Sequence, residues 1–248
     1  MTSYSAPIND IKFLYDHVLD FQKISQLPGY EEATPDLVDA ILEQASRFYE
    51  NVLSPTNKIA DNQGTKFEEN KVMTAPILDD VYEQFIEGGW TSLAFSVDHG
   101  GQGMPALLSV AADEMSHSAN MAFSLCPMLS KGVVTALSLY GNEEQKKIYL
   151  NKLIAGSWSG TMNLTEPQAG SDLSAIKTIA TPDDGHYLLK GQKIYITWGE
   201  HQLTENIIHL VLATTPGAPP GVKGISLFIV PKYLVDINGD ISKKNDIT

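Results

Sequence analysis

The spacing of the hydrophobic residues changes near Trp158, and this change limits the possible folds more than any other feature of the sequence. Before Trp158, apolar side chains recur every three or four residues, as at Leu37, Ile41 and Leu42, which is typical of amphipathic helices. After it, short apolar runs alternate with turn residues. The pattern predicts an α+β fold, with an all-helical domain over residues 1–156 and a mainly antiparallel β domain over residues 157–248.

Several predicted elements have recognisable ends. Thr34 followed by Pro35 fits a hydroxyl cap with proline at the first helical position, and Asn142 precedes two glutamates that favour a helix N-terminus. We expect helices in residues 11–21, 35–54, 75–85, 104–140 (two packed helices) and 142–154. Residues 60–71 are polar and predict a surface loop. Strands are expected in residues 179–195 (a hairpin turning at Asp184-Gly185), 207–213 and 224–230.

Charge and cysteine content limit the partners. The net charge of −13 argues against nucleic acid or an anionic membrane, because both need a positive face. The single cysteine, Cys126, excludes an internal disulfide, fits a reducing compartment and lies in an apolar run that predicts structural burial. The first residues lack the features of a signal peptide, and no window reaches the apolar length of a membrane span. We therefore expect a soluble cytoplasmic protein.

Two further patterns predict structure rather than chemistry. Residues 97–103 are glycine-rich but lack the preceding buried strand and the full spacing of a dinucleotide-binding loop, so we expect a structural turn that includes His99. Met115, Met121 and Met128 are more typical of core filling than of a metal site, and we expect no metal.

Residues 162–173, MNLTEPQAGSDL, cannot continue as a helix. Pro167 fixes its own φ and biases Glu166 toward an extended conformation, and Gly170 leaves no side chain over the backbone. Thr165 and Ser171 add hydroxyl groups. Free amides, hydroxyls and a glycine suit a planar polar ring or a phosphate. A tight turn in which Thr165 and Ser171 are turn formers is the alternative.

A second stretch, residues 191–201, reads GQKIYITWGEH. Together the two stretches resemble the paired flavin-binding signatures of the acyl-CoA dehydrogenase family, which read close to T-E-P-x-A-G-S-D and G-x-K-x-(W/Y)-I-T-x-G. The resemblance covers most of the chain, and it is closest to the long bacterial branch with an N-terminal extension and a G-E-H-x-L-T-E-N-I run, here residues 199–207. It implies the N-terminal domain and part of the middle domain of such a protein.

The resemblance implies FAD as cofactor and an acyl-CoA thioester as substrate. In the family a glutamate removes the α-proton while a hydride passes to flavin N5. Thr165 and the backbone of residues 162–165 would bond the flavin ring, Tyr195 would lie along it, and Thr197 would approach N5. Ser171 would lie near both the flavin diphosphate and the CoA arm of the substrate. The residues implied at the cofactor are Met162, Asn163, Leu164, Thr165, Gly170, Ser171, Tyr195, Ile196 and Thr197.

The family's catalytic glutamate lies in a C-terminal helical bundle, so we expect it beyond Thr248; neither Glu166 nor Glu200 has its position. The chain is expected to be an inactive N-terminal fragment whose unfinished β domain exposes a strand edge. The family also implies a homo-oligomer and electron-transfer flavoprotein as electron acceptor. Two other interpretations remain open: an acyl-CoA oxidase that passes electrons to oxygen, and a truncated, non-catalytic binding or assembly module.

Overall fold

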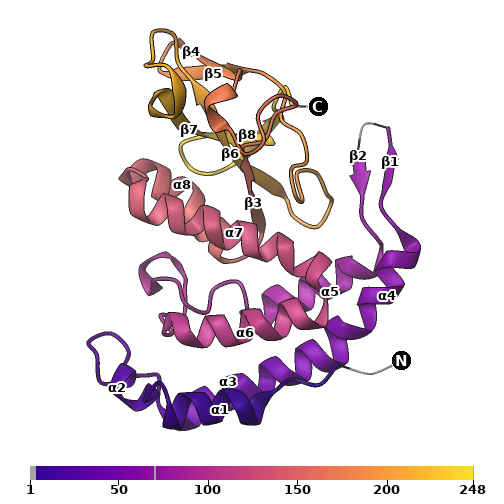
Figure 1. The fold of residues 1–248 in the computed structure, drawn as a ribbon, viewed down its shortest axis with the longest axis vertical. Helices are drawn as coiled ribbons and strands as arrows, with labels where there is room; N and C mark the ends of the chain where they lie inside the picture. The colour runs from indigo at the N-terminus through magenta and orange to yellow at the C-terminus, as the bar shows by residue number, and fades with distance from the viewer. Residues whose placement is uncertain (1–3, 70, 248) are drawn as a thin grey trace.

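The computed structural model describes residues 4–69 and 71–247. Its helices form a stack, and a smaller β region lies at the far end of that stack from the N-terminal helices (Figure 1). The helices are α1 (Ile8–His17), α2 (Phe21–Ser25), α3 (Pro35–Phe48), α4 (Ser54–Gln63), α5 (Ile77–Glu87), α6 (Ala106–Ala119), α7 (Met121–Tyr140) and α8 (Glu143–Ile154).

The main sheet is built around β6 (Asn206–Thr214). β3 (Trp158–Asn163) pairs with it in parallel, and β7 (Ile225–Pro231) pairs with it antiparallel. β4 (Ile179–Asp183) and β5 (His186–Lys190) form an antiparallel hairpin that joins β6 through one parallel pair, Ile179 with Thr214. Two small hairpins, β1 (Lys66–Glu68) with β2 (Lys71–Met73) and β8 (Tyr233–Val235) with β9 (Ile241–Lys244), complete the described strands.

The predicted fold class is confirmed, because the helical part precedes the sheet and residues 179–230 contain no α-helix. The turn at Asp184-Gly185 is also confirmed, and both residues have positive φ (37° and 81°), as a two-residue hairpin turn requires. The sheet is mixed, since β3 runs parallel to β6 along its whole length. That pairing joins strands far apart in sequence, which the local pattern does not encode.

Two local predictions were wrong. Residues 60–71 are not a loop, because α4 continues to Gln63 and the β1–β2 hairpin follows. Helical structure does not stop before Pro55: α3 ends at Phe48, but a π-helical turn, Tyr49–Leu53, connects it directly to α4. Pro55 is tolerated there because it lies in the first turn of α4, where a missing N–H has little cost.

α7 joins the two parts of the molecule. It packs on α6, on α8 and on β3. Cys126 lies buried in it, as predicted, and burial raises the pKa of this thiol to about 12. At Gly160 the strand approaches so closely that an added Cβ would lie 2.6 Å from the Val133 side chain. Of the three methionines, Met115 is buried as predicted, whereas Met121 and Met128 are exposed, so their assignment to the core was wrong.

α7 is also long and apolar enough to cross a membrane, with a mean hydropathy of 1.4 over its most apolar window. The expectation that no window reaches that length was therefore wrong. In this fold 44% of that window is buried inside the protein, and the core helix of a water-soluble protein can be equally long and apolar.

β3, β5 and β7 are each paired with a single neighbouring strand within the described residues. Leu188 on β5 is 56% exposed and Leu227 on β7 is 45% exposed. The expected unpaired strand edge is therefore present in the described part of the chain, whereas the expected apolar face stays a prediction.

Candidate functional site

The two signature stretches lie side by side. The Ile194 amide donates to the Thr165 carbonyl over 3.0 Å, and the Lys193 ammonium donates to the Leu164 carbonyl over 2.9 Å. Both contacts join the loop after β3 to the segment after β5. Tyr195, the next residue, is therefore held beside Thr165.

Glu166 is the centre of this junction. Glu166 is only 3% exposed. Its carboxylate accepts five hydrogen bonds: from the Thr178 hydroxyl (2.5 Å), the amides of Thr178 (3.1 Å) and Lys177 (2.7 Å), the Gln168 side chain (2.6 Å) and the Lys193 ammonium (2.9 Å). Burial acts to raise its pKa, but the hydrogen bonds from Thr178, Lys193 and Lys177 outweigh burial and lower the pKa to about 2. A carboxylate so fully engaged cannot take a substrate proton near neutral pH, which agrees with the expectation that Glu166 is not the base.

Gly191 completes the junction by having no side chain. A Cβ at this position would lie 2.2 Å from the Thr178 hydroxyl oxygen, the group that donates to Glu166. The first glycine of the second stretch is therefore required by packing against Thr178.

Several polar groups beside the junction have no protein partner. Among the described residues, no acceptor lies within hydrogen-bond range of the Leu164 and Thr165 amides, and none of the hydroxyls of Thr165, Ser171 and Thr197 makes a protein hydrogen bond. All four residues are exposed or half-buried. A planar ring with carbonyl and nitrogen acceptors fits such a set of available donors.

Met162 and Asn163 instead face the protein. The Met162 side chain packs against the core that α7, α8 and the sheet share. Asn163 accepts from the Thr161 hydroxyl over 2.6 Å, and that hydroxyl accepts from Nδ1 of the buried His209 over 2.7 Å. Burial, with a smaller contribution from Lys232, lowers the pKa of His209 to about 4. The Asn163 oxygen and the Met162 side chain are therefore engaged by the protein, and the backbone of both residues remains a candidate for contact with a ligand.

The segment from Tyr195 to Trp198 has unusual backbone geometry. Tyr195 (φ 56°) and Trp198 (φ 54°) are both left-handed, a conformation that costs energy for residues other than glycine. Tyr195 presents its ring to solvent and is 89% exposed, whereas Ile196 is half-buried and its carbonyl accepts the Gly199 amide over 3.0 Å. An aromatic ring so exposed at a strained turn is available to a planar ligand.

Gly170 and Ser171 lie on an exposed turn. Glu166 and Ala169 exchange two backbone hydrogen bonds of 2.9 and 3.0 Å, so a tight turn is present. Thr165 and Ser171 lie outside this turn, so their assignment as its turn formers was wrong. No protein atom lies within 4 Å of where a Gly170 Cβ would stand, so packing does not explain this glycine. No hydrogen bond among the described residues links Ser171 to the second stretch. The structure thus brings Thr165 and Tyr195 together, whereas no hydrogen bond among the described residues ties Ser171 to them.

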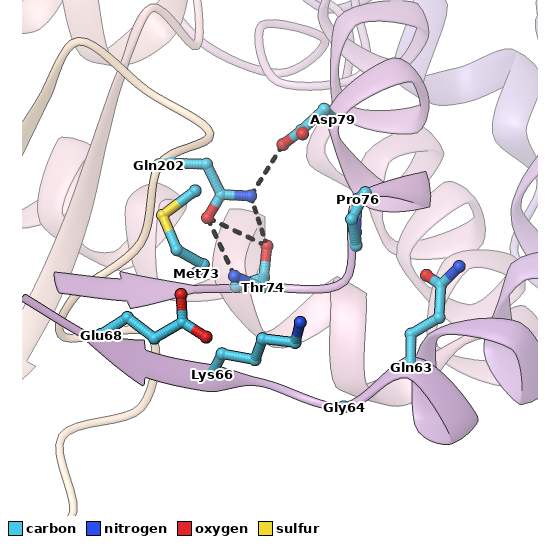
Figure 2. A pocket seen from close by; sticks show the side chains of 9 residues that line it. All are labelled: Gln63, Gly64, Lys66, Glu68, Met73, Thr74, Pro76, Asp79 and Gln202. Atoms are coloured by element: carbon cyan, nitrogen blue, oxygen red, sulfur yellow. Dashed lines mark hydrogen bonds between the residues drawn. The ribbon is translucent and has the colours of Figure 1, made fainter.

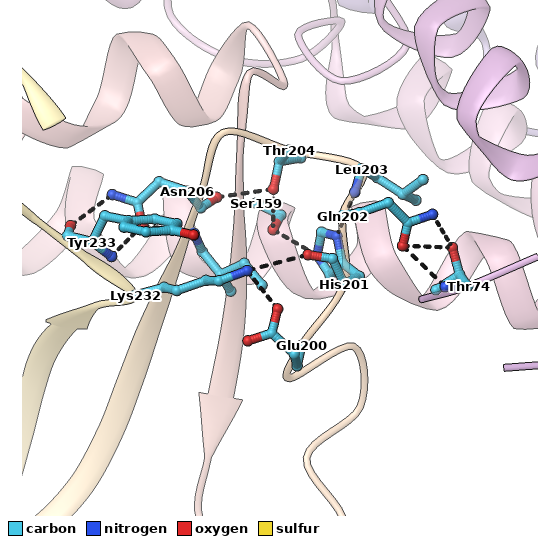
Figure 3. Close-up of polar contacts among 11 residues, drawn as sticks. Thr74, Ser159, Glu200, His201, Gln202, Leu203, Thr204, Asn206, Lys232 and Tyr233 are labelled. Carbon is cyan, nitrogen blue, oxygen red and sulfur yellow. Dashed lines mark hydrogen bonds and ion pairs between the residues drawn. The ribbon is translucent and has the colours of Figure 1, made fainter. Parts of the chain in front are cut away.

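A chain of polar groups joins the N-terminal ends of β3 and β6 (Figure 3). Nδ1 of His201 accepts the Leu203 amide over 3.2 Å, which places the proton on Nε2. Nε2 then donates to the Ser159 hydroxyl (3.0 Å), which donates to Thr204 (3.1 Å), which donates to the Asn206 carbonyl (2.9 Å). The chain of hydrogen bonds fixes the 199–207 run on the sheet.

The Ser159–His201 pair is not a nucleophile with its base. Each residue is 1% exposed, and the imidazole donates to the hydroxyl instead of accepting from it. Burial, followed by the nearby Lys232 charge, lowers the pKa of His201 to about 3, so it is neutral at physiological pH. Glu200 is engaged with Lys232 over 2.5 Å. These groups hold structure and carry no proton-transfer chemistry of their own.

A cavity of about 390 Å³ lies between the β1–β2 hairpin and the segment that carries Gln202 (Figure 2). Its wall is formed by Gln63, Gly64, Lys66, Glu68, Met73, Thr74, Pro76, Asp79 and Gln202. Charges of both signs line it, so it does not select one ligand chemistry. Among the described residues, no group of three His, Cys, Asp or Glu side chains could hold a metal ion.

Sequence reasoning missed the residues that build the junction. Glu166 was considered only as a possible base, and Lys193, Thr178 and Trp198 were given no role. One signal was present, since opposite charges at Glu166 and Lys193 occur inside two motifs that were expected to meet. Thr178 and Trp198 had no such signal, because their partners are backbone or carboxylate atoms remote in sequence.

Comparison with known proteins identifies the family. Sequence models of the acyl-CoA dehydrogenase N-terminal and middle domains match residues 36–157 and 161–244. The chain is 47% identical over 99% of its length to 3-methylmercaptopropionyl-CoA dehydrogenase of Ruegeria pomeroyi and 38% identical over 99% to a butyryl-CoA dehydrogenase of Syntrophomonas wolfei. It spans 42% and 41% of these relatives.

A solved structure shows the same fold. An acyl-CoA dehydrogenase from Bacillus anthracis, complexed with FAD, has a TM-score of 0.65 and 26% identity over 82% of this chain and 32% of its own. Two family models, close relatives and a matching fold agree with the paired signatures. The chain belongs to the acyl-CoA dehydrogenase family, of which it carries N-terminal and middle-domain sequence.

Proposed function

We propose that this chain forms the N-terminal and partial flavin-binding portion of an FAD-dependent acyl-CoA dehydrogenase. The observation that supports this most strongly is the junction of the two signature stretches, which places the available donors of Leu164 and Thr165 beside Tyr195. Relatives that match this chain over 99% of its length are named as acyl-CoA dehydrogenases, and one matching structure holds FAD.

In this proposal the chain's own residues orient the cofactor. The Leu164 and Thr165 amides and the Thr165 hydroxyl would hold the polar edge of the flavin, Tyr195 would cover its ring, and Thr197 would donate its hydroxyl. Gly170 leaves room for close approach, and Ser171 would hold the diphosphate or the CoA arm. When bound, FAD would supply the hydride acceptor for oxidation of the thioester. The α-proton requires a carboxylate base, which we propose lies outside these residues, because Glu166 and Glu200 are both engaged in ion pairs.

The partners follow from the same proposal. A saturated acyl-CoA is the substrate, electron-transfer flavoprotein is the electron acceptor, and the whole enzyme is a cytoplasmic homo-oligomer. The acyl group is best sought among short chains, since the two most similar relatives described above are named for a methylmercaptopropionyl and a butyryl thioester.

The test is anaerobic reduction of the flavin in the full-length protein by 3-methylmercaptopropionyl-CoA, butyryl-CoA and a long-chain acyl-CoA. We expect a yellow protein whose flavin is bleached by at least one of the short thioesters. Oxygen consumption in air distinguishes an oxidase from a dehydrogenase. A full-length protein that binds no FAD would favour the non-catalytic module instead.

The role of Thr197 can be tested in the same protein. Thr197→Val keeps the volume but removes the hydroxyl, so flavin reduction by the preferred acyl-CoA should slow by about tenfold, the effect of a charge-assisted hydrogen bond. Thr181→Val, on the exposed face of β4, is the matched control and should leave the rate unchanged. Equal rates in the Thr197 variant and the parent would remove this residue from the site.

A further inference from the structure

The segment that carries Tyr195 and Thr197 is fastened to the helical part of the molecule at two points. The first is Trp198, whose indole N–H donates to the Ala122 carbonyl over 2.9 Å. Ala122 lies in the first turn of α7, and the Trp198 ring packs against the core that the N-terminal helices form. A side chain directly after the proposed flavin contacts therefore binds a different domain from the one that carries it.

The second point is Gln202. Its amide nitrogen donates to the Thr74 hydroxyl (2.9 Å) and the Asp79 carboxylate (2.8 Å), and its oxygen accepts the Thr74 amide (3.0 Å), as Figure 2 shows. Thr74 is buried and Asp79 lies in the first turn of α5. Both polar ends of the Gln202 amide are thus satisfied by the helical part.

The strained turn, residues 195–198, begins directly after Ile194 and ends at Trp198, the first of these two anchors. The left-handed backbone of Tyr195 and Trp198 persists only where surrounding contacts hold it. The Ile194 amide fastens one side to Thr165, whereas the other side depends on Trp198 and Gln202. Loss of either anchor would allow the turn to relax to ordinary backbone geometry, which would move Tyr195 and Thr197.

We propose that Trp198 and Gln202 are positioning residues, through which the helical domain sets the shape of the flavin-facing turn from Tyr195 to Thr197. This rests on the proposed function, because the turn is assigned to flavin through it. Neither residue touches the cofactor in this proposal; both act by fixing the backbone that does.

The test compares Trp198→Phe and Gln202→Leu with two matched controls in the full-length protein. Trp90→Phe changes a tryptophan that lies within the helical core, and Gln102→Leu removes a glutamine whose amide bonds Gly89 and Ser92 inside the helical part. Hydrogen exchange of residues 194–200 is measured without cofactor, and FAD affinity is measured by titration of each apoprotein. Melting temperatures show whether a variant is merely less stable.

We expect exchange of residues 194–200 to quicken in both test variants. FAD affinity should fall by about fivefold in each, the effect of losing one hydrogen bond to the flavin when the turn relaxes. Both control variants should keep the hydrogen-exchange rates of residues 194–200 and the FAD affinity of the parent protein, whatever their melting temperatures. Unchanged exchange and affinity in either test variant that folds would overturn the role of that residue. If the parent binds no FAD, the proposed function fails, whereas the exchange data still decide whether the anchors hold the turn.

Discussion

Replacing Glu166 with glutamine should destabilise the protein far more than the loss of an ordinary surface charge. Glutamine keeps the shape of the side chain but introduces an NH₂ group where the carboxylate now accepts from five donors. At least one amide of Lys177 or Thr178 then faces another donor, and the Lys193 ammonium, 9% exposed, loses its counter-charge.

The structure gives the size of the effect. The pKa of Glu166 falls from an ordinary 4.5 to about 2, which corresponds to about 3 kcal/mol at 1.36 kcal/mol per pKa unit. Breaking a buried ion pair on one side costs about 3–5 kcal/mol, which agrees. Because the folded pKa is lowered, this stability is fully present above pH 4.5 and is lost as the pH falls toward 2.

Urea unfolding at pH 7, followed by far-UV circular dichroism at low protein concentration, measures the change. We expect Glu166→Gln to lower the free energy of unfolding by about 3–5 kcal/mol. The control is Glu143→Gln, which removes the ion pair between Glu143 and Lys146. The Glu143 side chain is 90% exposed, so this change should lower the free energy of unfolding by less than about 1 kcal/mol. A Glu166 variant within 1 kcal/mol of the parent would refute the central place of this carboxylate.

Three further predictions concern other parts of the molecule. His201 and His209 are buried and neutral, with folded pKa values of about 3 and 4. The free energy of unfolding should therefore fall as the pH drops below 6.5, by about 1.4 kcal/mol per pH unit for each histidine. Urea unfolding between pH 7 and pH 4 measures this, and a flat profile would contradict it. Gly160→Ala should cost about 1–3 kcal/mol through overlap with α7, whereas Gly132→Ala, in open space on α7, should stabilise slightly; equal effects in thermal melts would be contrary evidence. The 248-residue chain alone should hold little FAD and self-associate through its uncovered strand edges, which absorbance and light scattering would show; a yellow monomer would disprove it.

The helices could be predicted from sequence because their signals are local. Thr34 does cap α3 with its hydroxyl, and Asn142 forms a full capping box with Gln145 at the start of α8. The same locality explains the misses. A π-helical turn before Pro55 and the short β1–β2 hairpin depend on packing that no periodicity records.

That the two motifs would lie together was predictable, but the contacts that hold them together were not. The motifs located Thr165 and Tyr195, and the structure places them together through Ile194. Most of these contacts were not predictable, because Glu166 binds Thr178 and Lys193, and Trp198 binds Ala122, at positions more than ten residues away in the sequence. The role of Gly191 was not predictable either, because only the folded chain shows that it must leave room for Thr178.

The most direct test of the account is a crystal structure of the full-length protein with FAD. We predict that the flavin ring lies within about 3 Å of the Leu164 and Thr165 amides and of the Thr197 hydroxyl, and that the Tyr195 ring covers it. The Glu166–Lys193 contact should remain unchanged. A flavin bound elsewhere, with these donors still facing solvent, would contradict the assignment of the site.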